Sequence, residues 1–335
     1  MEFYNRRLEK IDYNTIKWDQ GQGNFGDVAK NSQIIYFLKK YRTNKKICIV
    51  HFNQFDEDII DNSLIDFLLI NCSDHPYNLP TYNSKTKSHL VLDSDFTKQN
   101  YWPFHLLFSS YLACNEEVDL QRIRPFLFNC INRSPRISRI YNTIKLKALD
   151  LPQMKLNWFH ANEANGPVPA ADDIIKEIGQ ENYETFLQIN TQAPKYQPKT
   201  EYQLCSSIDD YVDAYLNLVT ESRLEPIGFL TEKIYKPIRA GQLFLIQGPP
   251  GAVKFLRDIG FDTFDDFIDH DYDSIADWKE RTNYIHNELL RIHHDIKNIY
   301  FATINRRQKN IEIIRSFENK NFWSQSIKDK INANR

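Results

Sequence analysis

The sequence has few cysteines and no long apolar run, and both shortages exclude classes of protein. No apolar segment approaches the roughly 20 residues that a helix needs to span a bilayer, and the first residues lack the apolar core of a signal peptide. The five cysteines are odd in number and widely scattered, without a CxxC pair, so a disulfide framework is not indicated. We therefore expect a soluble protein of a reducing compartment, the cytoplasm.

An excess of positive charge is also missing. The 42 basic residues are balanced by 44 acidic ones, which gives a formal net charge of −2. Because proteins that coat nucleic acid need a basic stripe to neutralise phosphates, this balance argues against that function. It leaves room for a local basic pocket that binds a small phosphorylated ligand. The length of 335 residues is sufficient for two domains, each with its own core.

Short apolar runs predict buried strands in the first half of the chain. The runs lie at residues 46–52, 67–71, 89–92 and 125–130. Their spacing and polar ends favour an α/β sheet, with helices between the strands. These helices are expected at residues 101–113, 137–149 and 172–178. The pattern predicts an N-terminal domain at 1–120, a second domain at 121–300 and a C-terminal helical segment at 301–335.

The second half continues the strand and helix pattern. A helix is expected at 208–216, followed by a short strand at 218–220. Farther on, apolar residues recur at alternating spacings of three and four between residues 275 and 296, which is typical of one face of a long helix. A last helix is expected at about 310–327.

One further helix has clear start and stop signals. Thr231 can cap its N-terminus, and Glu232 in the first turn suits the positive end of the helix dipole. Gly241 is a natural stop, and a buried strand follows at 243–246. Pro237 lies inside this helix and should kink or weaken it.

Polar side chains gather around this helix start. Glu221 follows one strand, Glu232 and Lys233 open the helix, and Gly248 follows the next strand. Backbone N–H groups at a helix N-terminus bind phosphate oxygens, a lysine neutralises a leaving group, and a carboxylate can hold ribose hydroxyls. Ligands of α/β sheets bind beyond the carboxyl ends of strands, where these residues fall. The pattern therefore predicts a site for a nucleoside diphosphate.

The sequence motif "ES … TEK … AG … G" resembles that of a known family. It comes after a strand at 126–130, which is followed by Arg136 and Arg139. It is similar to the donor domain of the α-1,3-fucosyltransferases and related GT-B glycosyltransferases, over about residues 122–260. The words "TEKIYKPI" and "GFDTFDDFIDHDYDSI" resemble still more closely a set of uncharacterised phage-type and capsule-type glycosyltransferases. The resemblance implies an α/β, GT-B-like fold, with two Rossmann-like domains facing a central cleft and C-terminal helices. It also implies a nucleoside-diphosphate sugar as co-substrate and neither a cofactor nor a metal.

The resemblance implies roles for five side chains of the second domain. Arg139, with Arg136 as the near alternative, would contact the pyrophosphate or the transferred sugar. Glu232 would hold the ribose, and Lys233 would stabilise the departing diphosphate. Glu221 would sit against the donor sugar. The chain departs from the family where Ser222 replaces asparagine and where residues 242–244 replace a small residue, valine and proline.

The first domain would present the acceptor and, for an inverting reaction, a general base within reach of the acceptor hydroxyl. Asp27, Asp74, Asp93 and Asp95 are the candidates for that base. Asp93-Ser94-Asp95 also imitates a D-x-D word that holds a divalent ion on a diphosphate, which makes it a rival donor site. The glycines of residues 21–26 match G-x-G-x-x-G without a convincing strand before them, which disfavours a dinucleotide site. A glycine-rich loop across the cleft from the donor and an ordinary turn that begins a helix are the two equal interpretations.

Two other functions stay open. The first is a phage-type enzyme that glycosylates a hydroxymethylated base in DNA instead of a saccharide, which would need base extrusion and a basic lip. Lysines and an arginine between residues 39 and 46 could supply that lip. The second is a non-catalytic module that binds a nucleotide-sugar. The pair His293-His294 and the acidic run 262–273 have no metal-ligand spacing.

Overall fold

A computed structural model describes residues 116–132, 134–157, 168–192, 208–225 and 228–316, six short strands before residue 93, and residues 96, 97, 106, 109 and 113. The chain forms two compact units. The first comprises Met1–Phe104, Lys199–Leu204 and Asn321–Arg335, and the second His105–Pro198 and Cys205–Lys320. The domain division drawn from the sequence stays a prediction. Within the described part of the chain, no helix is long and apolar enough to cross a membrane.

The first unit contains a six-stranded sheet of order β2-β1-β3-β4-β5-β6. The strands are β1 (Glu2–Tyr4), β2 (Lys10–Asp12), β3 (Ile35–Phe37), β4 (Ile47–His51), β5 (Phe67–Asn71) and β6 (His89–Leu92). Strands β4, β5 and β6 are parallel, and they confirm the three apolar runs predicted in this region. Strands β1 to β3 pair antiparallel and were not expected, because they are only three residues long.

The second unit contains a four-stranded, fully parallel sheet of order β10-β9-β7-β8. Its strands are β7 (Phe126–Ile131), β8 (Met154–Asn157), β9 (Ala214–Thr220) and β10 (Leu243–Gln247). Every residue of β9 and β10 is buried, as expected for strands covered on both faces. The chain runs outward from β7 to β8 and then returns to the other side of β7 for β9 and β10. The direction of winding therefore reverses between β7 and β9.

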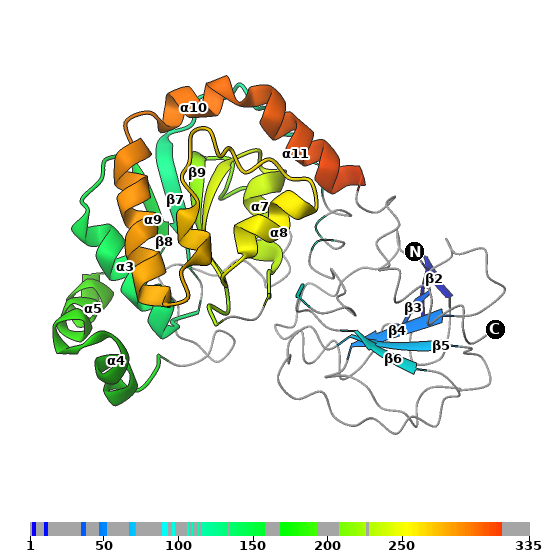
Figure 1. Cartoon of the computed structure of the whole chain (residues 1–335), viewed down its shortest axis with the longest axis horizontal. Coiled ribbons are helices and arrows are strands. Elements are labelled where there is room, and N and C mark those ends of the chain that lie inside the picture. The colour runs from blue at the N-terminus through cyan, green and yellow to red at the C-terminus, as the bar shows by residue number, and fades with distance from the viewer. Residues whose placement is uncertain are drawn as a thin grey trace. The chain divides into compact units, whose positions relative to one another are not determined.

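Helices cover both faces of this parallel sheet (Figure 1). They are α3 (Ile137–Ala148), α4 (Ala171–Ile178), α5 (Gln180–Gln192), α7 (Glu232–Arg239), α8 (Ala252–Asp258), α9 (Trp278–Ile292), α10 (Ile296–Ala302) and α11 (Ile304–Ser316), with a 3₁₀ turn η5 (Asp271–Ser274). Parallel connections are right-handed, so α3 and α7, which follow strands wound in opposite directions, lie on opposite faces. Helix α9 packs on α3 and β10, and α11 packs on α7.

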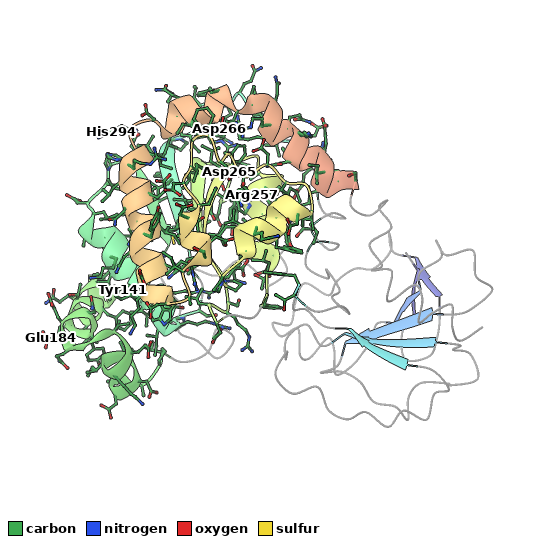
Figure 2. All side chains as sticks on the ribbon, in the orientation of Figure 1. Tyr141, Glu184, Arg257, Asp265, Asp266 and His294 are labelled. Atoms are coloured by element: carbon green, nitrogen blue, oxygen red, sulfur yellow. The ribbon has the colours of Figure 1, made fainter. Side chains whose placement is uncertain are left out.

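The hairpin of α4 and α5 is attached to α3 through a separate apolar cluster. Ile140 of α3, Ile174 of α4 and Phe186 of α5 are its buried centre. Tyr141 of α3 contacts the Trp278 ring edge-on, at 5.5 Å between the ring centroids. Figure 2 shows Tyr141 at the hairpin and Glu184 on its outer side. Only α4 was predicted in this region.

Two predicted helices are wrong. The segment expected as a helix at 208–216 is a turn that leads into strand β9 at Ala214, because pairing with both β7 and β10 overrides the local preference. The single long helix expected at 275–296 is two helices, α9 and α10. Ile292 and Ile296 are both buried, so the apolar spacing continues across the break and does not reveal it.

Several local signals are confirmed. Thr231 caps α7, and Gly241 has the positive φ of 61° that a helix stop requires. Helix α7 continues through Pro237. The last described helix ends at Ser316, so the predicted helix at 310–327 lies partly outside the described residues, as does most of the one expected at 101–113.

Candidate functional site

The candidate site lies at the carboxyl edge of the parallel sheet. Glu221 follows the last residue of β9, Gly248 follows the last residue of β10, and the chain after β7 leads into α3. Because the strands are parallel, these positions meet at one edge. Strands β7 and β9 are neighbours whose connections leave in opposite directions, and α/β sheets bind ligands at such a reversal.

The N-terminus of α7 is built around Thr231. Its hydroxyl oxygen accepts a hydrogen bond from the Lys233 amide at 3.4 Å, as an N-cap does. The same hydroxyl lies 2.6 Å from Oε2 of Glu221, and the Thr231 amide donates to Oε1 of Glu221 at 3.2 Å. The Glu221 side chain is fully buried. It therefore joins the end of β9 to the start of α7.

Lys233 and Glu232 lie at the partly exposed side of this helix start. The Lys233 ammonium is 2.9 Å from Oε1 of Glu232 and 3.1 Å from the hydroxyl oxygen of Thr231. An ammonium in this position is held in front of the helix N-terminus, where the macrodipole already favours an anion. The side chains are 24% and 18% exposed, so a ligand can reach both.

Helix α3 brings two arginines to the same edge. Its N-cap, Arg136, makes no side-chain capping bond, and the first turn carries no acidic residue. The Arg136 guanidinium donates to the Ser222 carbonyl. Arg139, one turn into the helix, donates to the carbonyls of Ser134 and Thr220 at 3.4 and 3.3 Å. Two cations therefore lie at the positive end of a helix that has no acidic cap.

Arg139 is a buried cation, like Arg124, Arg239, Arg281 and Arg307. Its side chain is 2% exposed, and its Nε has no hydrogen-bond partner among the described residues. Burial, followed by repulsion from Arg136, lowers the pKa of Arg139 to about 10, against the attraction of Glu221 and Glu232. A buried cation without a contacting carboxylate is costly. Such a site fits an anionic ligand.

Gly248 lies beside Glu221 and has little room for a side chain. A Cβ at this position would lie 3.0 Å from Cγ2 of Ile246 and 3.6 Å from Cγ of Glu221. The Glu221 amide also donates to the Gln247 carbonyl at 2.9 Å. The structure therefore brings Glu221, Gly248 and the α7 N-terminus together, in the order that the sequence pattern predicts. Direct contact of any of them with a ligand stays a prediction.

A network of buried polar side chains connects α3, β9 and α9 next to this sheet edge. Asn142 of α3 donates to the Thr220 hydroxyl at 3.5 Å, and Nε2 of His286 in α9 lies 2.7 Å from Oδ1 of Asn142. Burial and the neighbouring Lys145 lower the pKa of His286 to about 4. The sequence analysis missed these residues. The one available signal was the spacing of Asn142 and Thr143 three and four positions after Arg139, which places all three on one helix face.

The candidates of the first unit lie outside the described residues. These are Asp27, Asp74, Asp93 and Asp95, together with the glycine-rich segment 21–26. Within the part of the chain that the structure describes, no group of three or more histidine, cysteine, aspartate or glutamate side chains is arranged to hold a metal ion.

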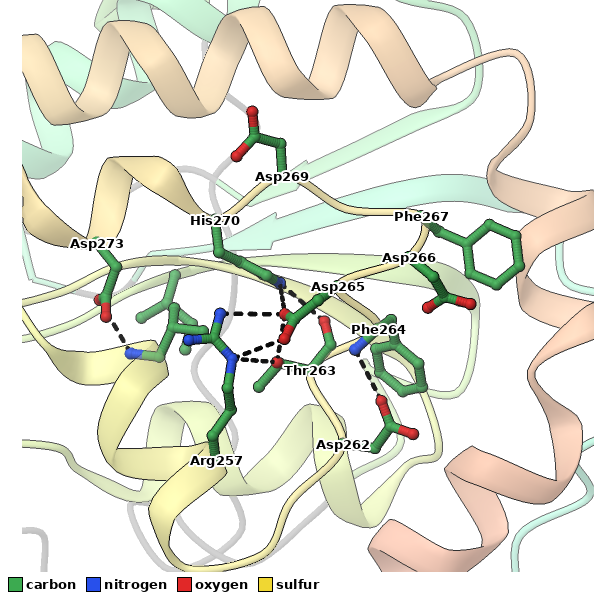
Figure 3. A network of polar contacts seen from close by, with 12 residues as sticks. Arg257, Asp262, Thr263, Phe264, Asp265, Asp266, Phe267, Asp269, His270 and Asp273 are labelled. Carbon is green, nitrogen blue, oxygen red and sulfur yellow. Dashed lines mark hydrogen bonds and ion pairs between the residues drawn. The ribbon is translucent and has the colours of Figure 1, made fainter.

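The acidic run 262–273 forms a loop whose carboxylates are bound by neighbouring groups of the protein (Figure 3). Asp265 pairs with Arg257 at 2.7 Å, and Asp262 pairs with Arg306 of α11 at 2.6 Å. The Asp273 carboxylate accepts from the amides of residues 253 and 254 at the start of α8. This loop and α8 enclose an open groove of about 1030 Å³. Arg257 and Asp265 of its lining pair with each other, and Asp266 pairs with Arg306, so the groove is a weaker candidate than the sheet edge.

No protein-family model matches this chain, and no curated protein matches it. Solved structures that are similar to it are glycosyltransferases. One is a DNA-modifying β-glucosyltransferase whose substrate is uridine diphosphoglucose, with 13% identity, 81% of this chain and 80% of that chain covered, and a TM-score of 0.39. Another is an α1,3-fucosyltransferase with GDP-fucose, with 10% identity, coverage of 78% and 80%, and a TM-score of 0.35.

Proposed function

We propose that this protein is a glycosyltransferase that binds a nucleoside-diphosphate sugar at the carboxyl edge of its parallel sheet and transfers the sugar to a hydroxyl group. The observation that carries the proposal is Arg139, a buried cation at the reversal between β7 and β9 that forms no ion pair with any carboxylate of the described residues. The N-terminus of α7 and Lys233 lie at the same edge. This combination suits a diphosphate, which needs positive charge and helix N–H groups together.

The roles follow from charge and position. Arg139 and Arg136 bind the pyrophosphate, and Glu232 holds the ribose hydroxyls. When the bond between the anomeric carbon and the diphosphate oxygen breaks, the electron pair leaves with the diphosphate. Lys233, Arg139 and the dipole of α7 stabilise that charge, so we expect no metal requirement. A general base, for which Asp27, Asp74, Asp93 and Asp95 stay the predicted candidates, takes the proton of the acceptor hydroxyl.

The test is a thermal-shift screen of UDP, GDP, CDP, ADP and their sugar conjugates, with and without EDTA. We expect one nucleoside diphosphate to stabilise the wild type by about 2.7 kcal/mol at roughly 100 times its Kd. Lys233→Ala and Glu232→Ala should lose the shift, because each removes a ligand contact. Lys254→Ala is the matched control, since Lys254 is exposed and its ammonium pairs with Asp258 of its own helix.

Three outcomes would contradict parts of the proposal. The absence of any shift would remove the donor site, and a strict metal requirement would favour Asp93 and Asp95 instead. Binding without hydrolysis or transfer of the sugar would leave a non-catalytic module. We expect a saccharide of a surface glycan as the acceptor, and salt-sensitive binding of duplex DNA would instead favour a modified base.

A further inference from the structure

The Thr231 hydroxyl has one proton, and its neighbours determine where that proton points. Both oxygens of Glu221 already accept a backbone N–H, Oε1 from Thr231 and Oε2 from Ser222 at 3.2 and 3.3 Å. An ionised carboxylate has no proton to give. At 2.6 Å from Oε2, the Thr231 hydroxyl must therefore be the donor.

This orientation directs the lone pairs of the hydroxyl oxygen away from Glu221 and toward Lys233. They accept from the Lys233 amide at 3.4 Å and from the Lys233 ammonium at 3.1 Å. A hydroxyl turned the other way would point its proton at the ammonium and repel it. The ammonium pairs with Glu232 at 2.9 Å. Through its bond to Thr231, its position also depends on the Glu221 carboxylate.

We propose that Glu221 is a positioning residue, which acts through Thr231 to hold the Lys233 ammonium at the N-terminus of α7. The sequence resemblance places Glu221 against the donor sugar, whereas its full burial and three hydrogen bonds turn it toward Thr231. The consequence for catalysis rests on the proposed function, because it assumes that Lys233 meets the leaving diphosphate. The placement of the ammonium does not rest on it.

The first experiment uses the full chain without ligand. The rate at which acetic anhydride acetylates Lys233 is measured by mass spectrometry, with Lys254 as the internal reference. In Glu221→Gln the new amide can donate to the Thr231 oxygen, so the hydroxyl turns its proton toward Lys233. We expect acetylation of Lys233 to rise about fivefold, which corresponds to the loss of one hydrogen bond. Thr231→Val should show the same rise and Thr231→Ser should not.

The second experiment is a double-mutant cycle on binding of the nucleoside diphosphate found in the screen. Glu221→Gln should weaken binding about tenfold in the wild-type background. It should have little effect on the weaker residual binding of Lys233→Ala, measured at a higher nucleotide concentration than in the screen, because Glu221 acts through Lys233. The matched control is Asp273→Asn, since that carboxylate accepts two backbone amides at the start of α8. We expect it to lower stability without changing nucleotide binding.

Two results would overturn the proposal. One is an equal loss of binding on Glu221→Gln in both backgrounds, and the other is an unchanged acetylation rate in Glu221→Gln and Thr231→Val. If no nucleoside diphosphate binds the wild type, the proposed function fails, and the acetylation of the ligand-free protein still decides the role of Glu221.

Discussion

At the scale of single residues, two buried arginines differ in how well they are satisfied. Arg124 donates to the carbonyls of Tyr211, Ala214 and Ala240 at 2.7–3.2 Å, and it lies over the Tyr300 ring. Among the described residues, Arg139 donates to two carbonyls at the longer distances of 3.4 and 3.3 Å. Arg124 is therefore the better satisfied cation and holds the fold together, whereas Arg139 is less well compensated by the described part of the protein.

This difference predicts that the same substitution changes stability by different amounts at the two positions. Arg139→Met should change the free energy of unfolding by less than about 1 kcal/mol, because losing two weak bonds is offset by removing an uncompensated buried charge. Arg124→Met should cost about 3 kcal/mol, since three buried carbonyls lose their donor. Denaturant unfolding measures both. Nucleotide stabilisation should disappear in Arg139→Met, and a large loss of stability in that variant would contradict its role as a ligand contact.

At the scale of elements, the C-terminus of α7 depends on one glycine. Gly241 has a φ of 61°, and a Cβ there would lie 2.2 Å from Cδ2 of Leu120. We expect Gly241→Ala to lower the free energy of unfolding by about 2 kcal/mol, through backbone strain and displacement of Leu120. Gly260→Ala is the control, because its φ is also positive but the space around it is open. It should cost about 1 kcal/mol from strain alone, and equal losses would show that the Leu120 contact is relieved freely.

At the scale of the whole molecule, a buried histidine makes stability depend on pH. The pKa of His286 is about 4 in the folded chain against an ordinary value of 6.5, so the unfolded chain binds the proton more readily. The contribution of neutral His286 to the free energy of unfolding is therefore fully present above pH 6.5 and is lost as the pH falls toward 4. The difference between the two pKa values corresponds to about 3 kcal/mol of stability.

Denaturant unfolding between pH 4 and 7 measures this dependence. His286→Gln should remove most of the slope, because glutamine keeps a donor for Asn142 and does not titrate in this range. His294→Gln, at an exposed position, should leave the slope as it is. An unchanged slope in His286→Gln would assign the dependence to other groups, such as His270, whose pKa burial also lowers.

Features that depend on residues close together in the chain could be predicted from the sequence. Strands such as β7 and β10 are continuous apolar runs, and the cap at Thr231 and the stop at Gly241 depend on residues within one helical turn. The order of Glu221, Lys233 and Gly248 along the chain follows from these elements, and parallel strands bring them to one edge. The candidate site was predictable to that extent.

Other features were decided by tertiary structure, because they depend on partners far away in the sequence. Residues 214–216 are strand and not helix since Ala214 and Leu216 pair with β7 and Leu216 pairs with β10 as well. The hydrogen bonds of the Glu221 carboxylate to Thr231 depend on the packing of the start of α7 against the end of β9. The burial of Arg139 requires the end of β9 to lie against α3. This contact joins residues far apart in the chain, so it could not be predicted from the local sequence.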